Sequence, residues 1–253
     1  MTVSADQIDA YWRDGYLKGV PLFTADEIDA HLRALVRIEA DEETRRGGEW
    51  ADRDYQPWDQ DDHPLFPWCH ALATDARLLD LASAILGPNL LIRNVDLFVK
   101  APRSRRVVGW HQDTAETGPD ADGLLTLWVA LTPATKASGC LAFLAGSHRK
   151  PLPGGPADRD HLTLRKEALS ALDPRSIVFN ELPVGHASVH HFRTVHASAQ
   201  NRTHERRLSF VVRLVRPDVP TSIAETGAAM LVRGADTHGH YSLKPTFPIG
   251  WRV

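Results

Sequence analysis

The sequence predicts a mainly β fold with flanking helices, in which a double-stranded β-helix, or jelly roll, carries N-terminal helices packed on one sheet. Two observations favour it. Short β-prone segments bounded by turn residues follow residue 88, at irregular spacing and joined by long loops. Helical periodicity is concentrated before them, so helices do not alternate with strands as they do in a parallel α/β sheet.

Three helices are expected in the N-terminal part. Ser4 can cap a helix that runs to Arg13, and Thr24 with Glu27 forms a capping box at the start of a second helix. A third helix fits residues 75–85, which a Gly-Pro pair follows. The second helix carries an apolar stripe at helical spacing, formed by Ile28, Leu32, Leu35 and Val36.

Five strands are expected after these helices. They cover residues 90–99, 124–131, 139–144, 187–192 and 208–215. In the last strand the even positions from Leu208 to Leu214 are apolar and should share one face, whereas Arg207, Ser209, Val211 and Arg213 should share the other. We expect one domain over residues 1–253, with a helical front (1–88), a jelly-roll core (89–216) and a closing tail (217–253).

The composition excludes several functional classes. The chain has 253 residues with a formal net charge of -3, so it has no general attraction for nucleic acid or an anionic membrane surface. No apolar run reaches the roughly 18–20 residues that a membrane span needs. The two cysteines, Cys69 and Cys140, lie far apart, which favours a reducing compartment. We therefore expect a cytoplasmic protein.

Histidine is the one over-represented residue type, with thirteen copies, and it is the commonest metal ligand. The tripeptide His111-Gln112-Asp113 places two potential ligands on the same face of an extended segment. A distant histidine would complete a set of two histidines and one carboxylate. Such a set leaves coordination positions open and suits Fe(II) that must also bind a cosubstrate and dioxygen.

Several motifs occur together in a characteristic order. They are DLFVKAP, WHQD, LTLWVALTPATKASGCLAFLAGSH, ELPVGHASVHHF and VHASAQNRTHERRLSF, preceded by DGYLKGVPLFTADEIDAHLRAL. In this order and at this spacing the chain resembles the phytanoyl-CoA dioxygenase-like (PhyH) family of Fe(II)/2-oxoglutarate-dependent oxygenases. The resemblance covers most of the chain and implies a cupin-like barrel.

The resemblance implies that His111, Asp113 and His196 hold the iron. It also implies 2-oxoglutarate and O2 as cosubstrates, with Arg207 binding the 5-carboxylate of 2-oxoglutarate and Ser198 supplying a hydroxyl. A bidentate arginine suits this role because a buried carboxylate needs a charged partner. The neighbouring Arg206 should point outward by strand parity.

Further contacts are expected around this centre. Trp128 matches a family tryptophan that lies against the cosubstrate, Thr126 shares its face, and Asn94 is expected to orient the carboxylates of 2-oxoglutarate. Residues expected near the substrate are Asp96, Gln112, Trp68, Arg213, His238 and Tyr241. The last two lie in the tail, which resembles the family's closing segment.

The resemblance implies hydroxylation of an unactivated C–H bond in a small molecule, with release of succinate and CO2. Related halogenases replace the ligand carboxylate by Ala or Gly, whereas this chain keeps Asp113. A bacterial natural-product intermediate is the expected substrate, and a monomer or homodimer the expected state. Three alternatives stay open: a non-catalytic cupin-like metal- or ligand-binding barrel, a Zn hydrolase using the same three residues, and desaturation or cyclisation by the same iron chemistry.

Overall fold

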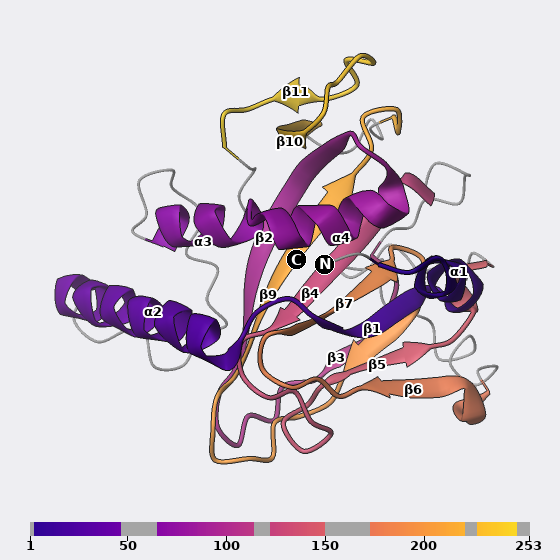
Figure 1. The fold of residues 1–253 in the computed structure, drawn as a ribbon. Coiled ribbons are helices and arrows are strands. Elements are labelled where there is room, and N and C mark those ends of the chain that lie inside the picture. The colour runs from indigo at the N-terminus through magenta and orange to yellow at the C-terminus, as the bar shows by residue number, and fades with distance from the viewer. Residues whose placement is uncertain (1–2, 47–64, 114–121, 150–172, 221–226, 247–253) are drawn as a thin grey trace, which may run out of the picture.

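The computed structural model describes residues 3–46, 65–113, 122–149, 173–220 and 227–246. In these ranges the chain is mostly β, with few helices, and its strands form two sheets (Figure 1). The larger sheet contains, in spatial order, β1 (Tyr16–Pro21), β7 (His186–His191), β4 (Leu124–Ala130), β9 (Arg207–Val215), β2 (Leu90–Lys100), β10 (Ala228–Arg233) and β11 (Ser242–Leu243). The smaller sheet contains β3 (Val108–His111), β8 (His196–Ser198), β5 (Leu141–Leu144) and β6 (Ile177–Asn180).

The three helices expected from the sequence are confirmed. Helix α1 (Ala5–Asp14) begins with a capping box between Ser4 and Gln7. Helix α2 (Ala25–Arg46) begins with the predicted box, in which Thr24 N donates to Glu27 Oε2 over 2.8 Å. Helix α4 (Ala76–Leu86) is capped by Asp75. Within the apolar stripe of α2 the prediction is wrong for Val36, which is 57% exposed.

A fourth helix, α3 (Leu65–Ala73), was not predicted from the sequence. Its segment contains Pro67, which suggests a loop, yet proline is tolerated in the first turn of a helix because those N–H groups have no intrahelical acceptor. The described ranges also contain two short 3-10 turns, Ser147–Arg149 and Pro174–Ser176.

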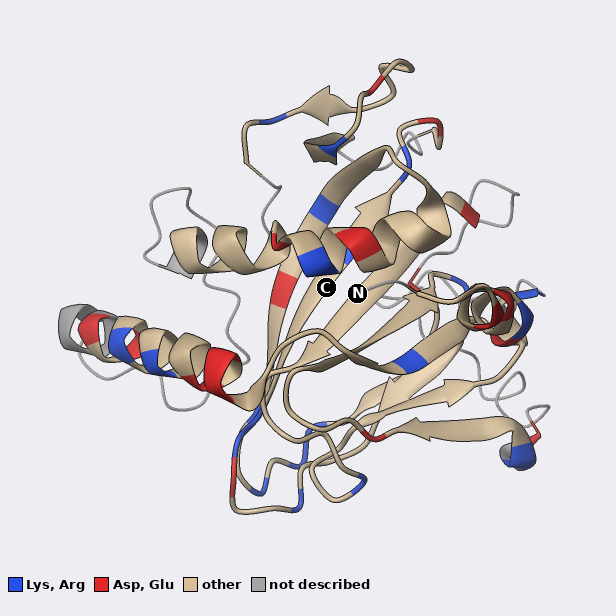
Figure 2. Cartoon of the chain, viewed as in Figure 1, with Lys and Arg blue, Asp and Glu red and all other residues tan. Residues whose placement is uncertain are grey.

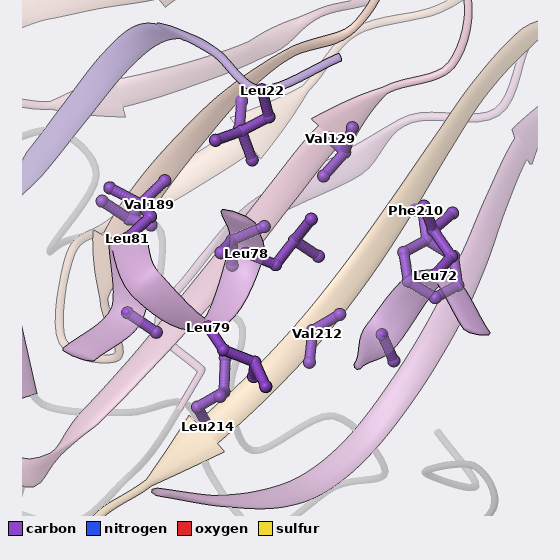
Figure 3. Packing of buried hydrophobic residues seen from close by; sticks show 14 of the residues in the cluster. Leu22, Leu72, Leu78, Leu79, Leu81, Val129, Val189, Phe210, Val212 and Leu214 are labelled. Atoms are coloured by element: carbon purple, nitrogen blue, oxygen red, sulfur yellow. The ribbon is translucent and has the colours of Figure 1, made fainter. Parts of the chain in front are cut away.

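Helices α3 and α4 lie against one face of the larger sheet (Figure 1). Their leucines meet the apolar residues of β9 and β4, and Figure 3 shows Leu72, Leu78 and Leu79 packed among Phe210, Val212 and Leu214. Each such buried side chain contributes about 1.5–3 kcal/mol to folding. This cluster is the main hydrophobic core of the described residues.

The alternation predicted for β9 is confirmed by its burial. Leu208, Phe210, Val212 and Leu214 belong to the core beneath the helices, whereas Arg207, Val211 and Arg213 line a cavity on the opposite face. Pairing with the neighbouring strands puts Arg213 opposite Asn94 of β2 and Thr126 of β4. One face of the sheet therefore holds the core, and the other holds polar residues.

The front and the tail of the chain both join the larger sheet. Strand β1 pairs with β7, and β10 pairs with β2, both antiparallel. The expected helical front and closing tail therefore contribute strands as well. The short strands β3, β6 and β8 were also not predicted, since each has only three or four residues.

Charged side chains gather mainly outside the core. Helix α2 carries both signs along its length (Figure 2), as expected of a solvent-facing helix. Among the helices that the structure describes, none combines the length and the apolar character needed to cross a membrane.

Candidate metal centre

Three side chains from β3, β8 and the residues after β3 meet at one point. Antiparallel pairing puts His111 opposite His196, and their ring centroids lie 4.1 Å apart. Asp113 Oδ1 lies 3.9 Å from His111 Nε2 and 3.8 Å from His196 Nε2. The structure thus brings together the three residues that the sequence nominated as iron ligands, with ligand atoms within 4.8 Å of one another.

The hydrogen bonds of both histidines direct one nitrogen toward this point. His111 Nδ1 donates to Gly109 O over 2.8 Å, and His196 Nδ1 donates to Thr194 O over 2.9 Å. Because a carbonyl only accepts, Nδ1 carries the hydrogen and the lone pair of Nε2 faces Asp113. Burial lowers the pKa of His196 well below its usual value, as does the nearby His111, so the ring stays neutral.

The carboxylate of Asp113 is held by its second oxygen. Thr126 Oγ1 donates to Asp113 Oδ2 over 2.6 Å, and His190 Nε2 donates to the same oxygen over 3.3 Å. Burial would raise the pKa of Asp113, but Arg213, His196 and His190 lower it well below its ordinary value. Asp113 is therefore ionised, with Oδ1 directed at the two histidines.

The donor set fits a divalent transition metal. Two neutral imidazoles and one carboxylate oxygen on one side of an ion make the arrangement found for non-haem Fe(II), which retains open positions. Backbone carbonyls fix both rings, and Thr126 and His190 fix the carboxylate, so the ligand atoms are oriented without the ion.

A cavity extends from these ligands between the two sheets. Its wall is partly apolar, with Phe98, Trp128, Leu141 and Val211, and Ser198 also lines it. Arg207, which is 3% exposed, also lines the cavity, at the start of β9, whereas Arg213, the residue of this strand near Asp113, lies toward its other end. The cavity thus joins the three candidate ligands to a buried guanidinium.

Arg207 is a buried cation, and none of the carboxylates in the described ranges pairs with it. Its Nη1 donates to Ser209 Oγ over 2.7 Å, its guanidinium carbon lies 5.6 Å from the centre of the Trp128 ring, and its Nε has no partner. Burial lowers the pKa of Arg207 to about 10. A buried cation of this kind is stabilised by an anion, which the cavity gives room for.

Lys100 is a second buried cation, beside Arg207 on the neighbouring strand, and was not nominated from the sequence. It is paired in register with Arg207 and donates to Arg106 O and Ala199 O. Burial lowers the pKa of Lys100 to about 8, and the charge of Arg207 contributes. The signal was available, because Lys100 shares the polar face of its strand with Asn94 and Asp96.

A second ionic group lies beneath the ligands. Arg213 pairs with Asp96, and its Nη2 lies 3.7 Å from Asp113 Oδ1. Asn94 Nδ2 donates to Asp96 Oδ2 over 3.0 Å. Arg213 lines the cavity, whereas Asn94 and Asp96 are buried behind it and their free Oδ1 atoms do not reach its surface.

Four residues expected near the substrate lie elsewhere. The expectation for Trp68 is wrong, because this residue of α3 packs edge-on against Phe210 in the core, on the opposite face of the sheet from Asp113. Gln112 points away from the cavity and donates to Arg193 O over 2.6 Å.

The two tail residues also lie outside the lining of the cavity. His238 is exposed and stacks on His240, with ring centroids 5.8 Å apart. Tyr241 is buried in a separate apolar cluster with Leu91 and Phe192. Neither contacts the candidate ligands, so a substrate role for them has no support in this arrangement.

The fold and the donor set define a class: a two-sheet β protein with a mononuclear metal centre of the 2-His-1-carboxylate type. The profile of the family described as Phytanoyl-CoA dioxygenase (PhyH) matches residues 11–209. The chain belongs to this family.

Known proteins similar to the chain include both sequence relatives and solved structures. The "Probable alpha-ketoglutarate-dependent hypophosphite dioxygenase" of Stutzerimonas stutzeri is 30% identical over 222 residues, which span 80% of this chain and 75% of that protein. The structure of the non-heme monooxygenase ThoJ aligns with a TM-score of 0.76 at 26% identity, over 96% of this chain and 88% of ThoJ. The alpha-ketoglutarate-dependent epimerase SnoN, from nogalamycin biosynthesis, aligns with a TM-score of 0.63 at 26% identity, over 87% and 86% of the two chains.

Proposed function

We propose that this protein is an Fe(II)- and 2-oxoglutarate-dependent dioxygenase that hydroxylates an unactivated C–H bond of a small molecule and releases succinate and CO2. The observation that carries the proposal is Arg207, a buried cation that pairs with none of the described carboxylates and lines the same cavity as His111, Asp113 and His196. The relatives whose names state dependence on alpha-ketoglutarate, which is 2-oxoglutarate, support the choice of cosubstrate.

In this proposal the two sheets are the halves of a double-stranded β-helix and the centre lies between them. His111, Asp113 and His196 hold the metal, and Arg207 with Lys100 binds the distal carboxylate of 2-oxoglutarate. Ser198 lines the cavity near Arg207 and supplies its hydroxyl there. When bound, Fe(II) with 2-oxoglutarate and dioxygen supplies the oxidant that breaks the C–H bond.

The protein contributes orientation and charge. Thr126 and His190 hold one oxygen of Asp113, which leaves Oδ1 for the metal and keeps other positions open. Trp128 forms an apolar wall beside Arg207. This wall excludes water and strengthens the attraction between the guanidinium and the cosubstrate carboxylate, because the local dielectric is low.

The first experiment tests cosubstrate binding. Anaerobic Fe(II) and 2-oxoglutarate should give the weak visible charge-transfer band of a chelate, titrated with 2-oxoglutarate. Arg207→Met should weaken 2-oxoglutarate binding by about 100-fold, equal to ~2.7 kcal/mol, because a buried carboxylate loses its charged partner. Arg206→Met is the matched control, since Arg206 points outward to Glu39. Absence of the band in the wild type, or an unchanged affinity in Arg207→Met, contradicts the proposal.

The second experiment identifies the reaction. Candidate substrates are screened for substrate-dependent succinate release, and each product is then weighed by mass spectrometry. Hydroxylation adds one oxygen atom, whereas desaturation or cyclisation removes two hydrogens, and epimerisation, the activity named for SnoN, leaves the mass unchanged. A non-catalytic metal-binding barrel would release no succinate with any substrate.

Asp113 favours oxygenation over halogenation within this chemistry. Its carboxylate occupies the position that halogenases leave to a halide ion. A small bacterial natural-product intermediate remains our proposed substrate class, and no contact with nucleic acid or membrane is required by the site. The two cysteines of the chain are buried and unpaired, which is compatible with the proposed cytoplasmic location.

A further inference from the structure

A tight turn between β7 and β8 holds two of the three candidate ligands. The turn closes where Thr194 N donates to His191 O over 2.8 Å. Two of its carbonyls accept hydrogen bonds from candidate ligands: Phe192 O accepts from the backbone N of Asp113 over 2.8 Å, and Thr194 O accepts from His196 Nδ1 over 2.9 Å. A shift of this turn would therefore move both ligands together.

The C-terminal end of helix α1 holds this turn in place, although Gly15 and Thr194 are 179 residues apart in the sequence. Gly15 O accepts two hydrogen bonds from it, one from His191 N over 2.9 Å and one from Thr194 Oγ1 over 2.6 Å. Gly15 itself is fixed to the helix, because its N donates to Tyr11 O over 2.8 Å. Thr194 is fully buried, so water does not compete for its hydroxyl.

Only glycine fits at this contact. Gly15 has a φ of 85°, in the left-handed region that residues with a Cβ rarely adopt. A Cβ built at Gly15 would lie 2.5 Å from Thr194 Oγ1 and 2.4 Å from His148 Nδ1. Both distances are far below van der Waals contact. The close approach of the helix end to the turn therefore depends on the missing side chain.

We propose that Gly15 and Thr194 are positioning residues of the metal centre, which fix Asp113 and His196 through the turn that Gly15 O holds. The inference rests on the proposed function, since it assigns these ligands to a metal. Two features distinguish it from simple packing. First, hydrogen bonds connect Gly15 O to the turn at His191 and Thr194. Second, carbonyls of the same turn accept hydrogen bonds from Asp113 and His196.

The test measures binding of Co(II) to the metal-free, full-length protein without 2-oxoglutarate, by its visible absorption. Thr194→Val removes the hydroxyl and nearly keeps the shape, and we expect it to weaken Co(II) binding by about 10-fold, the lower end of the range for residues that orient metal ligands. Thr194→Ser keeps the hydroxyl and should stay within about 2-fold of the wild type. Gly15→Ala should weaken binding more than Thr194→Val.

Ser4→Ala is the matched control. It removes the capping box at the other end of α1 and lowers stability without touching the turn. We expect a lower unfolding temperature with unchanged Co(II) affinity. Wild-type affinity in Thr194→Val, equal weakening in Ser4→Ala, or no rescue by Thr194→Ser would each overturn the inference.

One further variant separates this inference from the proposed function. His111→Ala removes a candidate ligand and should abolish Co(II) binding. If the wild type binds Co(II), His111→Ala does not, and Thr194→Val binds normally, the metal centre stands and the positioning role is wrong. If the wild type does not bind, or His111→Ala binds as the wild type does, the proposed centre fails and the positioning role fails with it.

Discussion

The two faces of the larger sheet are built from alternate residues of the same strands, yet they have opposite chemistry. Toward the helices β9 presents Phe210 and Val212 to leucines of α3 and α4 (Figure 3). Toward the smaller sheet it presents Arg207 and Arg213 to the cavity that the candidate ligands also line. Along β9, alternate residues therefore serve different purposes: those facing the helices stabilise the fold, and those facing the cavity form the candidate site. Substitutions on the two faces should therefore have separable effects.

The largest effect is expected on the helix face. Phe210→Ala should lower the free energy of unfolding by about 3–5 kcal/mol, because it leaves a cavity among well-packed side chains. Urea denaturation of the metal-free protein measures this loss. In the fraction that stays folded, Co(II) affinity should match that of the wild type. A large loss of affinity without a loss of stability would show that the two faces are not separable.

The second prediction concerns pH and the helix-face histidine His191. Burial lowers the pKa of His191 to about 4, although its bond to Asp122 acts in the opposite direction. Since the pKa of the folded state lies below the usual 6.5, the unfolded chain takes up the proton first as the pH falls. The stability that depends on neutral His191 should be fully present above about pH 6.5 and fall by up to about 3 kcal/mol toward pH 4.

Urea denaturation at several pH values between 7 and 4 measures this dependence. His191→Gln should make the curve less steep, because glutamine has no proton to take up, while buried histidines such as His196 keep their own contributions. The comparison variant is His186→Gln, which changes a half-buried histidine at the start of the same strand, β7. If both variants flatten the curve equally, or neither does, His191 is not the source of the pH dependence.

The third prediction concerns the cavity face at Thr126. Thr126→Val should weaken metal binding by about 10-fold, because Asp113 Oδ2 loses its shortest hydrogen bond. Thr126→Ser keeps a hydroxyl for this hydrogen bond and should bind the metal as the wild type does. Isothermal titration with Co(II) measures both. Equal affinity of the valine and serine variants would mean that the hydroxyl of Thr126 does not orient the carboxylate.

The smallest effect is expected at Arg206, which immediately precedes Arg207 and β9 in the chain. Its bond to Glu39 lies at the surface, with the two side chains 38% and 24% exposed. Arg206→Ala should cost about 0.5 kcal/mol or less and should leave 2-oxoglutarate binding unchanged. Urea denaturation measures the change in the free energy of unfolding, and the charge-transfer titration measures 2-oxoglutarate binding. A loss of stability above about 1 kcal/mol would mean that this surface ion pair contributes more than such pairs usually do.

The alternation of side chains along a strand also explains which parts of the fold could be predicted from the sequence. The long strands and the direction of Arg207 follow from alternation along one strand, which is a local property. Helix α3 was missed because Pro64 and Pro67 resemble loop residues, and the mistaken role of Trp68 followed from that error. The position of Trp68 depends on contacts with β9, which are 140 residues away and leave no local pattern.

In the candidate site, too, some features could be predicted from the sequence and others depend on contacts between distant segments. The family resemblance nominated His111, Asp113 and His196, and strand pairing in the structure brings them together. The partners of these residues could not be predicted in the same way. That Thr126 bonds to Asp113, and that Asp96 pairs with Arg213 rather than facing the cavity, depends on the register between neighbouring strands.

The register between β4, β9 and β2 has a consequence for folding. A slip of one residue along β9 would turn Arg207 and Arg213 toward the leucines of α3 and α4 and turn Phe210 toward the cavity. Burying two guanidinium groups among hydrocarbon side chains is prohibitively unfavourable. Arg207 and Arg213 therefore also destabilise the shifted register of β9 while the sheet forms. Replacing both by apolar residues would reduce the free-energy difference between the native register and the shifted one.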